Sequence, residues 1–165
     1  MTAVTEAVTE TTAERAALDA YLQAQRDSAL AVVDGLDEAA WRTSIVPSGW
    51  TPLSLVEHLG HAERFWAQVV LAGEVSPLPW SSDEERREVD DVVAFYRDQC
   101  ARTDAILVGL RLGDRPPGVF VPNLPTEVHD VRDVVLHLVE ETARHAGHLD
   151  IARELLDGQT GLGPR

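Results

Sequence analysis

The sequence predicts an all-α protein, a four-helix bundle. Four long stretches place apolar residues three and four positions apart, the spacing of an amphipathic helix, and none shows the alternation that is typical of a half-buried strand. The chain has 165 residues, of which 44% are hydrophobic, so it can bury one sizeable core and is most simply a single domain. Long amphipathic helices bury their apolar faces against one another, and a bundle achieves this for four of them.

The bundle domain is expected to span residues 13–158. Residues 1–12 have neither the basic region nor the apolar region of a signal peptide, and we expect them to form a disordered leader. Gly158 is followed by a polar tail, residues 159–165.

The first helix is expected over residues 13–40. Asp34-Gly35 should divide it into two pieces, because glycine is a poor residue inside a helix. The second helix is expected over residues 52–71. Thr51 is its predicted N-cap, and it is followed by a proline, which is favoured at the first helical position.

The third helix is expected to begin near Ser82, whose hydroxyl would cap it, and to end near Leu110. Residues 111–129 are rich in proline and too long for a tight turn between antiparallel helices, so we interpret them as a crossover connection or a lid. Asp130 is the predicted cap of the fourth helix, which should extend over residues 130–157.

Charge and cysteine content exclude several classes of partner. The formal net charge of −14 repels phosphate backbones and anionic lipids, which argues against nucleic acids and membrane surfaces. No stretch is long and apolar enough to cross a bilayer. The single cysteine, Cys100, excludes an intramolecular disulfide, is expected to be an inert buried thiol, and fits a cytoplasmic protein.

Exposed apolar residues such as Trp41 and Val70 would support a homodimer without requiring one.

Charged and polar side chains lie on the apolar face of the fourth helix. Glu141 falls on the edge of that face, and His145 falls inside it, one turn further on. A carboxylate and an imidazole both need a partner when they are buried, and a divalent metal suits them together. On the second helix His58 lies within the apolar sector, whereas His61 is expected to face solvent. Two nitrogens and one oxygen suit Zn²⁺, Ni²⁺, Fe²⁺ or Mn²⁺ and leave a coordination position open.

Each of these residues also has a plainer interpretation. A single histidine such as His58 is more often a hydrogen-bonded core or edge residue than a ligand. A local hydrogen bond across one helical turn accounts for Glu141 and His145 equally well. His137 and His148 lie near the same face and are rival ligands, although we prefer for His148 a contact with a ligand side chain or with substrate. Spacing alone therefore leaves the ligand set open.

Two motifs resemble those of the DinB/YfiT-like superfamily of metal-binding four-helix bundles. Residues 58–63 read H-L-G-H-A-E, which matches the superfamily motif H-L-x-x-x-E. Residues 137–158 read H-L-V-E-E-T-A-R-H-A-G-H-L-D-I-A-R-E-L-L-D-G and are similar to an actinobacterial branch. Where the superfamily commonly has a second histidine ligand, this chain has Glu141, as in the related mycothiol-dependent maleylpyruvate isomerases. The resemblance covers residues 13–158.

The resemblance implies both a ligand set and an architecture. The ligands would be His58, Glu141 and His145, with zinc as the first choice of metal and nickel, iron or manganese as alternatives. The helices would run up-down-down-up, and residues 111–129 would make the crossover. Mycothiol is the low-molecular-weight thiol that such relatives use.

Three functions are compatible with such a site. The first is a metal-dependent thiol transferase or isomerase that acts on small electrophiles, with Arg144, His148 and Asp150 as candidate contacts for the thiol cofactor. The second is a metal-dependent hydrolase, and the third is a non-catalytic metal-binding or stress-linked protein. An open coordination position favours the first two, whereas a fourth ligand from His137 or His148 favours the third.

Overall fold

The computed structural model describes residues 11–74, 87–117 and 128–161, and these ranges contain helices and no strand. The prediction of an all-α protein is therefore confirmed. None of the described helices is long and apolar enough to span a bilayer. The helices are α1 (Thr12–Val33), the short α2 (Glu38–Trp41), α3 (Pro52–Arg64), the π-helix η1 (Phe65–Leu71), α4 (Val89–Val108) and α5 (Val131–Asp157).

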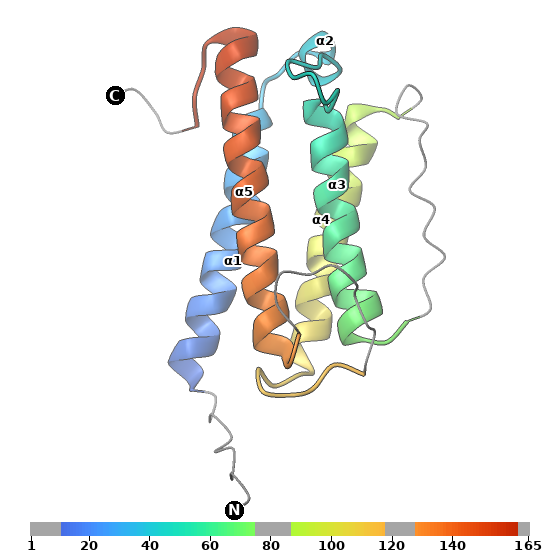
Figure 1. The fold of residues 1–165 in the computed structure, drawn as a ribbon, viewed down its shortest axis with the longest axis vertical. Coiled ribbons are helices and arrows are strands. Elements are labelled where there is room, and N and C mark those ends of the chain that lie inside the picture. The colour runs from blue at the N-terminus through green and yellow to red at the C-terminus, as the bar shows by residue number, and fades with distance from the viewer. Residues whose placement is uncertain (1–10, 75–86, 118–127, 162–165) are drawn as a thin grey trace, which may run out of the picture.

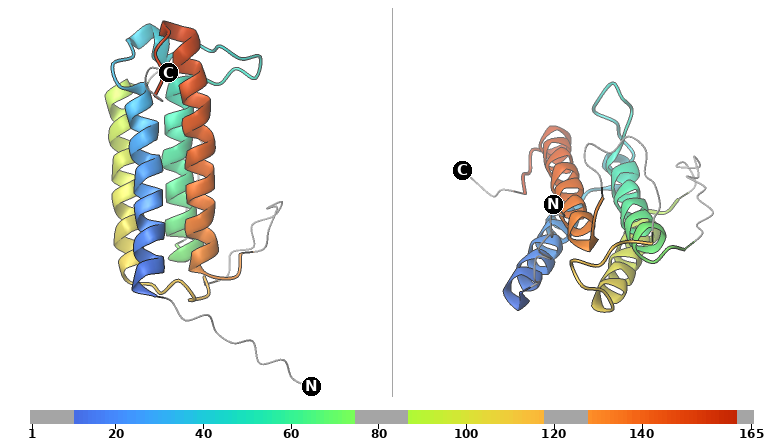
Figure 2. Two further views of the ribbon diagram at one scale, coloured as in Figure 1. Left: turned by 90° about the vertical axis from the view of Figure 1, so that its left-hand side faces the viewer. Right: turned by 60° about the horizontal axis from the view of Figure 1, so that its bottom comes forward.

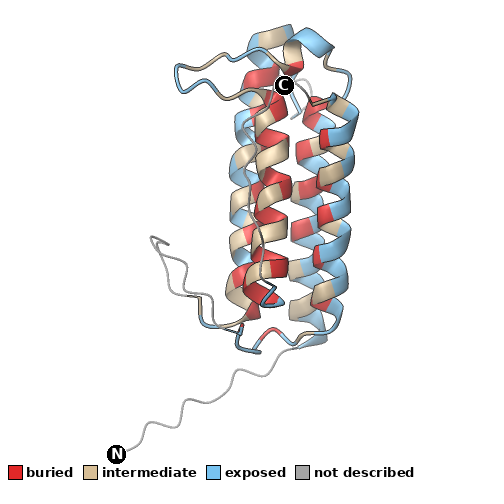
Figure 3. Ribbon diagram, turned by 90° about the vertical axis from the view of Figure 1, so that its right-hand side faces the viewer, coloured by how far each residue is buried: buried red, intermediate tan, exposed pale blue. Residues whose placement is uncertain are grey.

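The long helices lie side by side, with their axes along the long dimension of the molecule (Figure 1). Helix α1 packs mainly against α5, α3 packs mainly against α4, and α3 also meets α5. Buried positions recur in stripes along the helices (Figure 3). They form two apolar clusters, one that includes Val56, Leu59 and Leu149 and one that includes Leu22, Val70 and Leu138. The face that α3 shares with α5 holds the candidate site.

Side-chain caps begin the two helices that carry the candidate site, as predicted. The Thr51 hydroxyl oxygen accepts from the backbone N–H of Ser54 at 3.1 Å, and Ser54 Oγ accepts from the backbone N–H of Thr51 at 2.8 Å. Asp130 caps α5 by accepting from the backbone N–H of Asp133 at 3.1 Å. Gly158 ends α5 with a φ of 79°, a conformation that glycine adopts without strain.

The first predicted helix is divided near Asp34-Gly35, as expected. Helix α1 ends at Val33, Gly35 has a φ of 74°, and α2 begins after its cap, Asp37. The second predicted helix does extend to Leu71, but its last seven residues are π-helical. A π-turn is wider than an α-turn, so it changes which side chains face the core.

Several predicted boundaries fall at or beyond the edge of the described residues. The predicted start of the third helix at Ser82 lies outside them, and the described helix α4 begins at Val89. Helix α1 begins at Thr12, one residue before the expected boundary, because Thr11 caps it. Residues 1–10 of the predicted leader and the end of the predicted tail, residues 162–165, also lie outside the described ranges.

The connection between α4 and α5 is not a crossover. The backbone N–H of Val131 donates to the carbonyl of Asp114 at 3.0 Å, and that of Arg132 donates to the carbonyl of Leu112 at 2.9 Å. The start of α5 therefore lies against the end of α4. The interpretation of residues 111–129 as a crossover is wrong, because the length of a connection does not show whether its two ends lie at the same end of the molecule.

The chain instead changes ends between η1 and α4. Arg42, just after α2, donates to the backbone carbonyl of Arg87 at 2.6 Å, which places the start of α4 beside α2. The colour sequence in Figure 2 shows that the chain runs in the same direction along α3 and α4, away from the end that holds α2.

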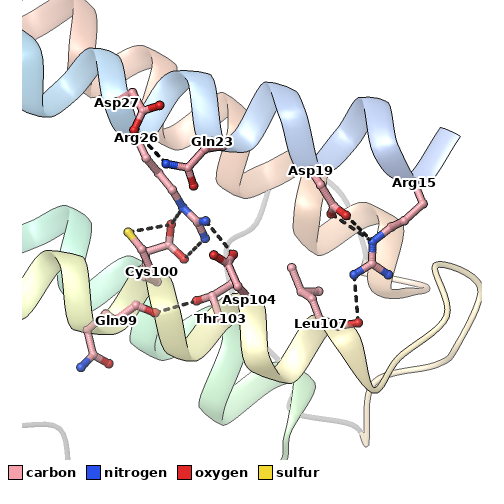
Figure 4. A network of polar contacts seen from close by, with 11 residues as sticks. Arg15, Asp19, Gln23, Arg26, Asp27, Gln99, Cys100, Thr103, Asp104 and Leu107 are labelled. Carbon is pink, nitrogen blue, oxygen red and sulfur yellow. Dashed lines mark hydrogen bonds and ion pairs between the residues drawn. The ribbon is translucent and has the colours of Figure 1, made fainter. Parts of the chain in front are cut away.

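A buried polar network joins α1, α3 and α4 (Figure 4). Arg26 on α1, only 3% exposed, donates to both carboxylate oxygens of Glu63 on α3 at 2.7 and 2.9 Å. Its remaining terminal nitrogen donates to Asp104 on α4 at 2.7 Å, and the Cys100 sulfur lies 3.8 Å from Glu63 Oε1. Because a buried charge is costly without its partner, an arrangement of α1 and α3 that separated Arg26 from Glu63 would be destabilised.

The apolar surface differs from the prediction. Trp41 and Val70, expected to be exposed, are 5% and 1% exposed. Trp41 packs into the core beside α3, and Val70 lies in η1, in the apolar cluster that includes Leu22 and Leu138. Neither residue supports a homodimer. Within the described ranges, the exposed large apolar residues are Tyr21, Val108, Leu136, Ile151 and Leu155.

Candidate metal centre

The structure brings His58, Glu141 and His145 together between α3 and α5. His58 lies in the second turn of α3, and the other two residues lie one turn apart in the middle of α5. His58 Nε2 is 2.9 Å from Glu141 Oε1, and His145 Nε2 is 3.0 Å from the same oxygen. One ligand atom from each residue lies within 4.8 Å of the other two. The three residues expected from the sequence therefore form one cluster.

The cluster is half-buried, and His58 is its most exposed member. The exposed fractions of the side chains are 34% for His58, 19% for Glu141 and 15% for His145. The two imidazole rings lie edge to face, with centroids 4.9 Å apart and planes at 80°. Both rings place their Nε2 atom against the same carboxylate oxygen, Glu141 Oε1.

The two histidines lower the pKa of Glu141. The hydrogen bond with His145 is the largest cause, the hydrogen bond with His58 comes next, and burial opposes both. Glu141 therefore stays ionised throughout the physiological pH range. The cluster consists of a carboxylate anion between two imidazole nitrogens.

This donor set fits a divalent cation. Bonds of ~2.0–2.2 Å from zinc to nitrogen and oxygen place tetrahedral ligand atoms about 3.4 Å apart. The two short contacts at Glu141 Oε1, 2.9 and 3.0 Å, would lengthen by only a few tenths of an ångström. Without a cation, each histidine donates its Nε2–H to Glu141. With one, the nitrogen lone pairs of His58 and His145 replace those protons.

The prediction that His61 faces solvent is wrong. Its side chain is only 13% exposed, and its ring centroid lies 5.0 Å from that of Phe95 on α4. Its Nε2 lies 3.6 Å from Glu57 Oε1. Burial is the main reason why the pKa of His61 is lowered. Packing against α4 covers a position that the helical pattern of one segment assigns to the surface.

The two rival ligands lie beside the cluster rather than in it. The His137 ring packs on Trp66 with centroids 4.3 Å apart, and burial lowers its pKa. His148 is exposed, and its Nδ1 lies 3.3 Å from the Nδ1 of His145. This contact is on the side of the His145 ring that faces away from Glu141.

The other candidate cofactor contacts lie on the outer part of α5. Arg144 is exposed and pairs with Glu140 on the same helix, and Asp150 accepts from the backbone N–H of Gly161. Neither of these two contacts reaches the cluster of three. Binding of a thiol cofactor by Arg144, His148 and Asp150 stays a prediction.

Trp50 is a neighbour of the site that the sequence did not single out. Its ring centroid lies 6.0 Å from that of His148. The sequence feature that could have indicated this position is that Trp50 immediately precedes Thr51, the cap of the helix that carries His58.

The fold and the cluster define an all-helical protein with a candidate divalent-metal centre between α3 and α5. The family model described as Mycothiol-S-transferase matches residues 17–158, from the first turns of α1 to the end of α5. The chain belongs to this family, which confirms the resemblance to DinB-related mycothiol enzymes. No curated protein matches the chain.

Proposed function

We propose that this protein is a divalent-metal-dependent S-transferase that joins a low-molecular-weight thiol, mycothiol, to small electrophiles. One observation carries the proposal: Glu141 Oε1 lies within hydrogen-bond distance of Nε2 of both His58 and His145, in a chain of the mycothiol-S-transferase family. Two nitrogens and one oxygen favour zinc, with nickel, iron and manganese as alternatives. Three protein ligands leave room for a sulfur atom.

A divalent cation bound here would lower the pKa of a coordinating thiol, so that the reactive thiolate forms near neutral pH. Glu141 supplies the negative charge that holds a cation, and its lowered pKa keeps that charge present. His145 and Glu141 are less exposed to water than His58, which borders the side from which a thiol would enter. The half-buried position strengthens each electrostatic contact at the site.

The proposal includes a DinB-like, up-down-down-up four-helix bundle and a cytoplasmic location. The bundle is supported by the shared direction of α3 and α4 and by the contact between the end of α4 and the start of α5. This order makes α3 and α5 antiparallel neighbours, so that both can contribute to one site. A cytoplasmic location follows from the thiol chemistry, because the cytoplasm keeps low-molecular-weight thiols reduced.

Elemental analysis followed by a thiol-transfer assay tests the function. The purified protein should bind about one zinc ion per chain, as expected for one three-ligand site. With mycothiol and a haloalkyl electrophile, the zinc-loaded protein should form the thioether: the thiolate sulfur displaces the halogen, which leaves as a halide ion, and the proton of the thiol passes to the buffer. His145→Ala should lose zinc and activity, whereas His129→Ala, which removes an exposed histidine that contacts Asp133, should keep both.

Other outcomes would point to the alternatives. Cleavage of ester or amide substrates without thioether formation would favour a hydrolase. Tightly bound zinc without either activity would favour a non-catalytic protein. A protein that forms the thioether equally well after zinc is removed would contradict the proposal.

A further inference from the structure

We propose that His148 is a positioning residue for His145: it accepts a hydrogen bond from the Nδ1–H of His145 and thereby sets the tautomer and ring orientation of that ligand. The inference rests on the proposed metal centre. It extends that centre by one residue that does not itself bind the cation.

The two nitrogens of His145 face different partners. Its Nε2 lies 3.0 Å from Glu141 Oε1, and its Nδ1 lies 3.3 Å from His148 Nδ1. A neutral imidazole carries one proton, and a nitrogen that binds a cation does so with its lone pair. Coordination through Nε2 therefore leaves the proton of His145 on Nδ1. The Nδ1 of His148 must then be the acceptor, and His148 carries its own proton on Nε2.

The spacing along α5 explains why these particular atoms meet. His148 is three residues beyond His145, and Glu141 is four residues before it, so all three lie on one face of the helix. Glu141 contacts the far nitrogen of the His145 ring, and His148 contacts the nitrogen nearer the backbone. One helix therefore orients His145 from both sides, and only His58 has to come from another helix.

Trp50 borders this contact on the side of the loop that precedes α3. Its ring centroid lies 6.0 Å from that of His148, with the two planes tilted by 37°, and it packs partly buried against the core. His148 is exposed, and water competes for a hydrogen bond at the surface. A large ring held in place by the core limits the orientations open to His148.

A role for His148 as a fourth ligand does not agree with this geometry. Its Nδ1 faces the side of the His145 ring that is opposite to Glu141. Among the described residues, the group of three ligand atoms that all lie within 4.8 Å of one another comes from His58, Glu141 and His145 and does not include His148. His148 can orient a ligand from this position, and orienting partners of this kind commonly alter metal affinity.

Zinc affinity measured by chelator competition on the full-length protein tests the proposal. His148→Leu removes the acceptor and should weaken zinc binding about 10- to 100-fold while the far-ultraviolet circular dichroism stays unchanged. His148→Asn places an amide oxygen near the position of Nδ1, so its affinity should remain within about 3-fold of the unchanged protein. His129→Leu is the matched control, since it makes the same change at an exposed histidine beside Asp133, and should have no effect.

Equal affinities for His148→Leu and the unchanged protein would overturn the inference. So would an equal loss in His148→Asn and His148→Leu, because the acceptor atom would then not be what matters. Absence of zinc binding by the unchanged protein would overturn the metal centre together with this inference, so the two failures are distinguishable.

Nuclear magnetic resonance of the unchanged, zinc-loaded protein gives a second test that needs no variant. Long-range ¹H–¹⁵N spectra should show His145 protonated at Nδ1 and His148 protonated at Nε2. A zinc-loaded protein in which His148 is protonated at Nδ1 would overturn the assignment, because that nitrogen would then have no lone pair to accept with.

Discussion

In the proposed metal centre, Glu141 would supply both a ligand atom and a negative charge. Its Oε1 is the atom that both histidines share, and they lower its pKa. A carboxylate neutralises part of the charge of a divalent cation, which a third histidine would not do. Its contribution should therefore depend on charge as well as on shape.

Glu141→Gln should reduce zinc affinity on the order of 100-fold, because it keeps the size of the side chain and removes the charge. Glu140→Gln is the matched control, since Glu140 is the adjacent residue and its exposed side chain pairs with Arg144. Both variants should be compared by chelator competition. Equal affinities for the two would show that Glu141 is not a ligand.

Acid should weaken zinc binding through the histidines and not through Glu141. The lowered pKa keeps Glu141 ionised, so protons compete with the cation only at the two imidazoles. Each imidazole must give up a proton to bind a cation, so two of them give a fall of up to about two decades in apparent affinity per pH unit once both are protonated in the metal-free protein. Zinc titrations from about pH 5 to 8 measure this. Affinity that is constant over the range would contradict histidine coordination.

Among the helices, α3 connects the candidate site with the rest of the interior. His58 on one side of it faces α5, and Glu63, five residues later, faces α1 and is bound by Arg26. The two ends of the H-L-x-x-x-E motif therefore have separate roles. The pair of Arg26 and Glu63 also borders the Cys100 thiol on α4.

Glu63→Ala should destabilise the protein by about 3–5 kcal/mol, because it leaves the buried Arg26 charge without its partner. Asp104→Ala removes the exposed partner of the same arginine and should cost less than about 1 kcal/mol. Urea denaturation measures both free energies of unfolding. The double change Arg26→Met with Glu63→Leu should recover much of the loss, since apolar replacement of a whole buried pair is often neutral. Equal effects of Glu63→Ala and Asp104→Ala would contradict this account.

Cys100 should be unreactive in the folded protein. Burial, reinforced by the neighbouring Glu63, raises its pKa to about 12, whereas a thiol in an unfolded chain titrates near ~8.5. The protonated thiol is thus favoured by folding, so its stabilising contribution is complete below the unfolded pKa and is lost as the pH rises towards 12.

Iodoacetamide at pH ~8.5, the ordinary pKa of a thiol, should label Cys100 in urea and not in the folded protein. The melting temperature should fall on raising the pH from ~8.5, and it should fall less in Cys100→Ala. Rapid labelling of the folded protein would show that the thiol is accessible and ionised.

In the molecule as a whole, the two apolar clusters extend along the helices, whereas the candidate site occupies only one face between α3 and α5. The apolar clusters should therefore supply most of the folding free energy, and a cation should add only what its binding contributes.

The metal-free protein should remain helical. Zinc at 100 times its dissociation constant should add about 2.7 kcal/mol, which corresponds to a rise in melting temperature of roughly 5–10 °C for a chain of this size. Circular dichroism with chelator and with zinc measures both effects. Loss of the helical signal on chelation would show instead that the metal supports the fold.

The sequence by itself determined the features that depend on neighbouring residues of one segment. The caps at Thr51 and Asp130 follow from local hydrogen bonds, and the shared face of Glu141 and His145 follows from helical spacing. Placing His58 with them needed the motif that it shares with a known superfamily as well as the apolar pattern.

Only the tertiary structure decided which surfaces are covered and where the chain changes ends. His61 and Trp41 are shielded by segments distant in the sequence, and the partner of Glu63 lies 37 residues away on α1. The position of the crossover, likewise, appears only from contacts between helix ends. Burial and pairing are properties of two segments in contact, and the periodicity of one helix carries no information about which segment will lie against it.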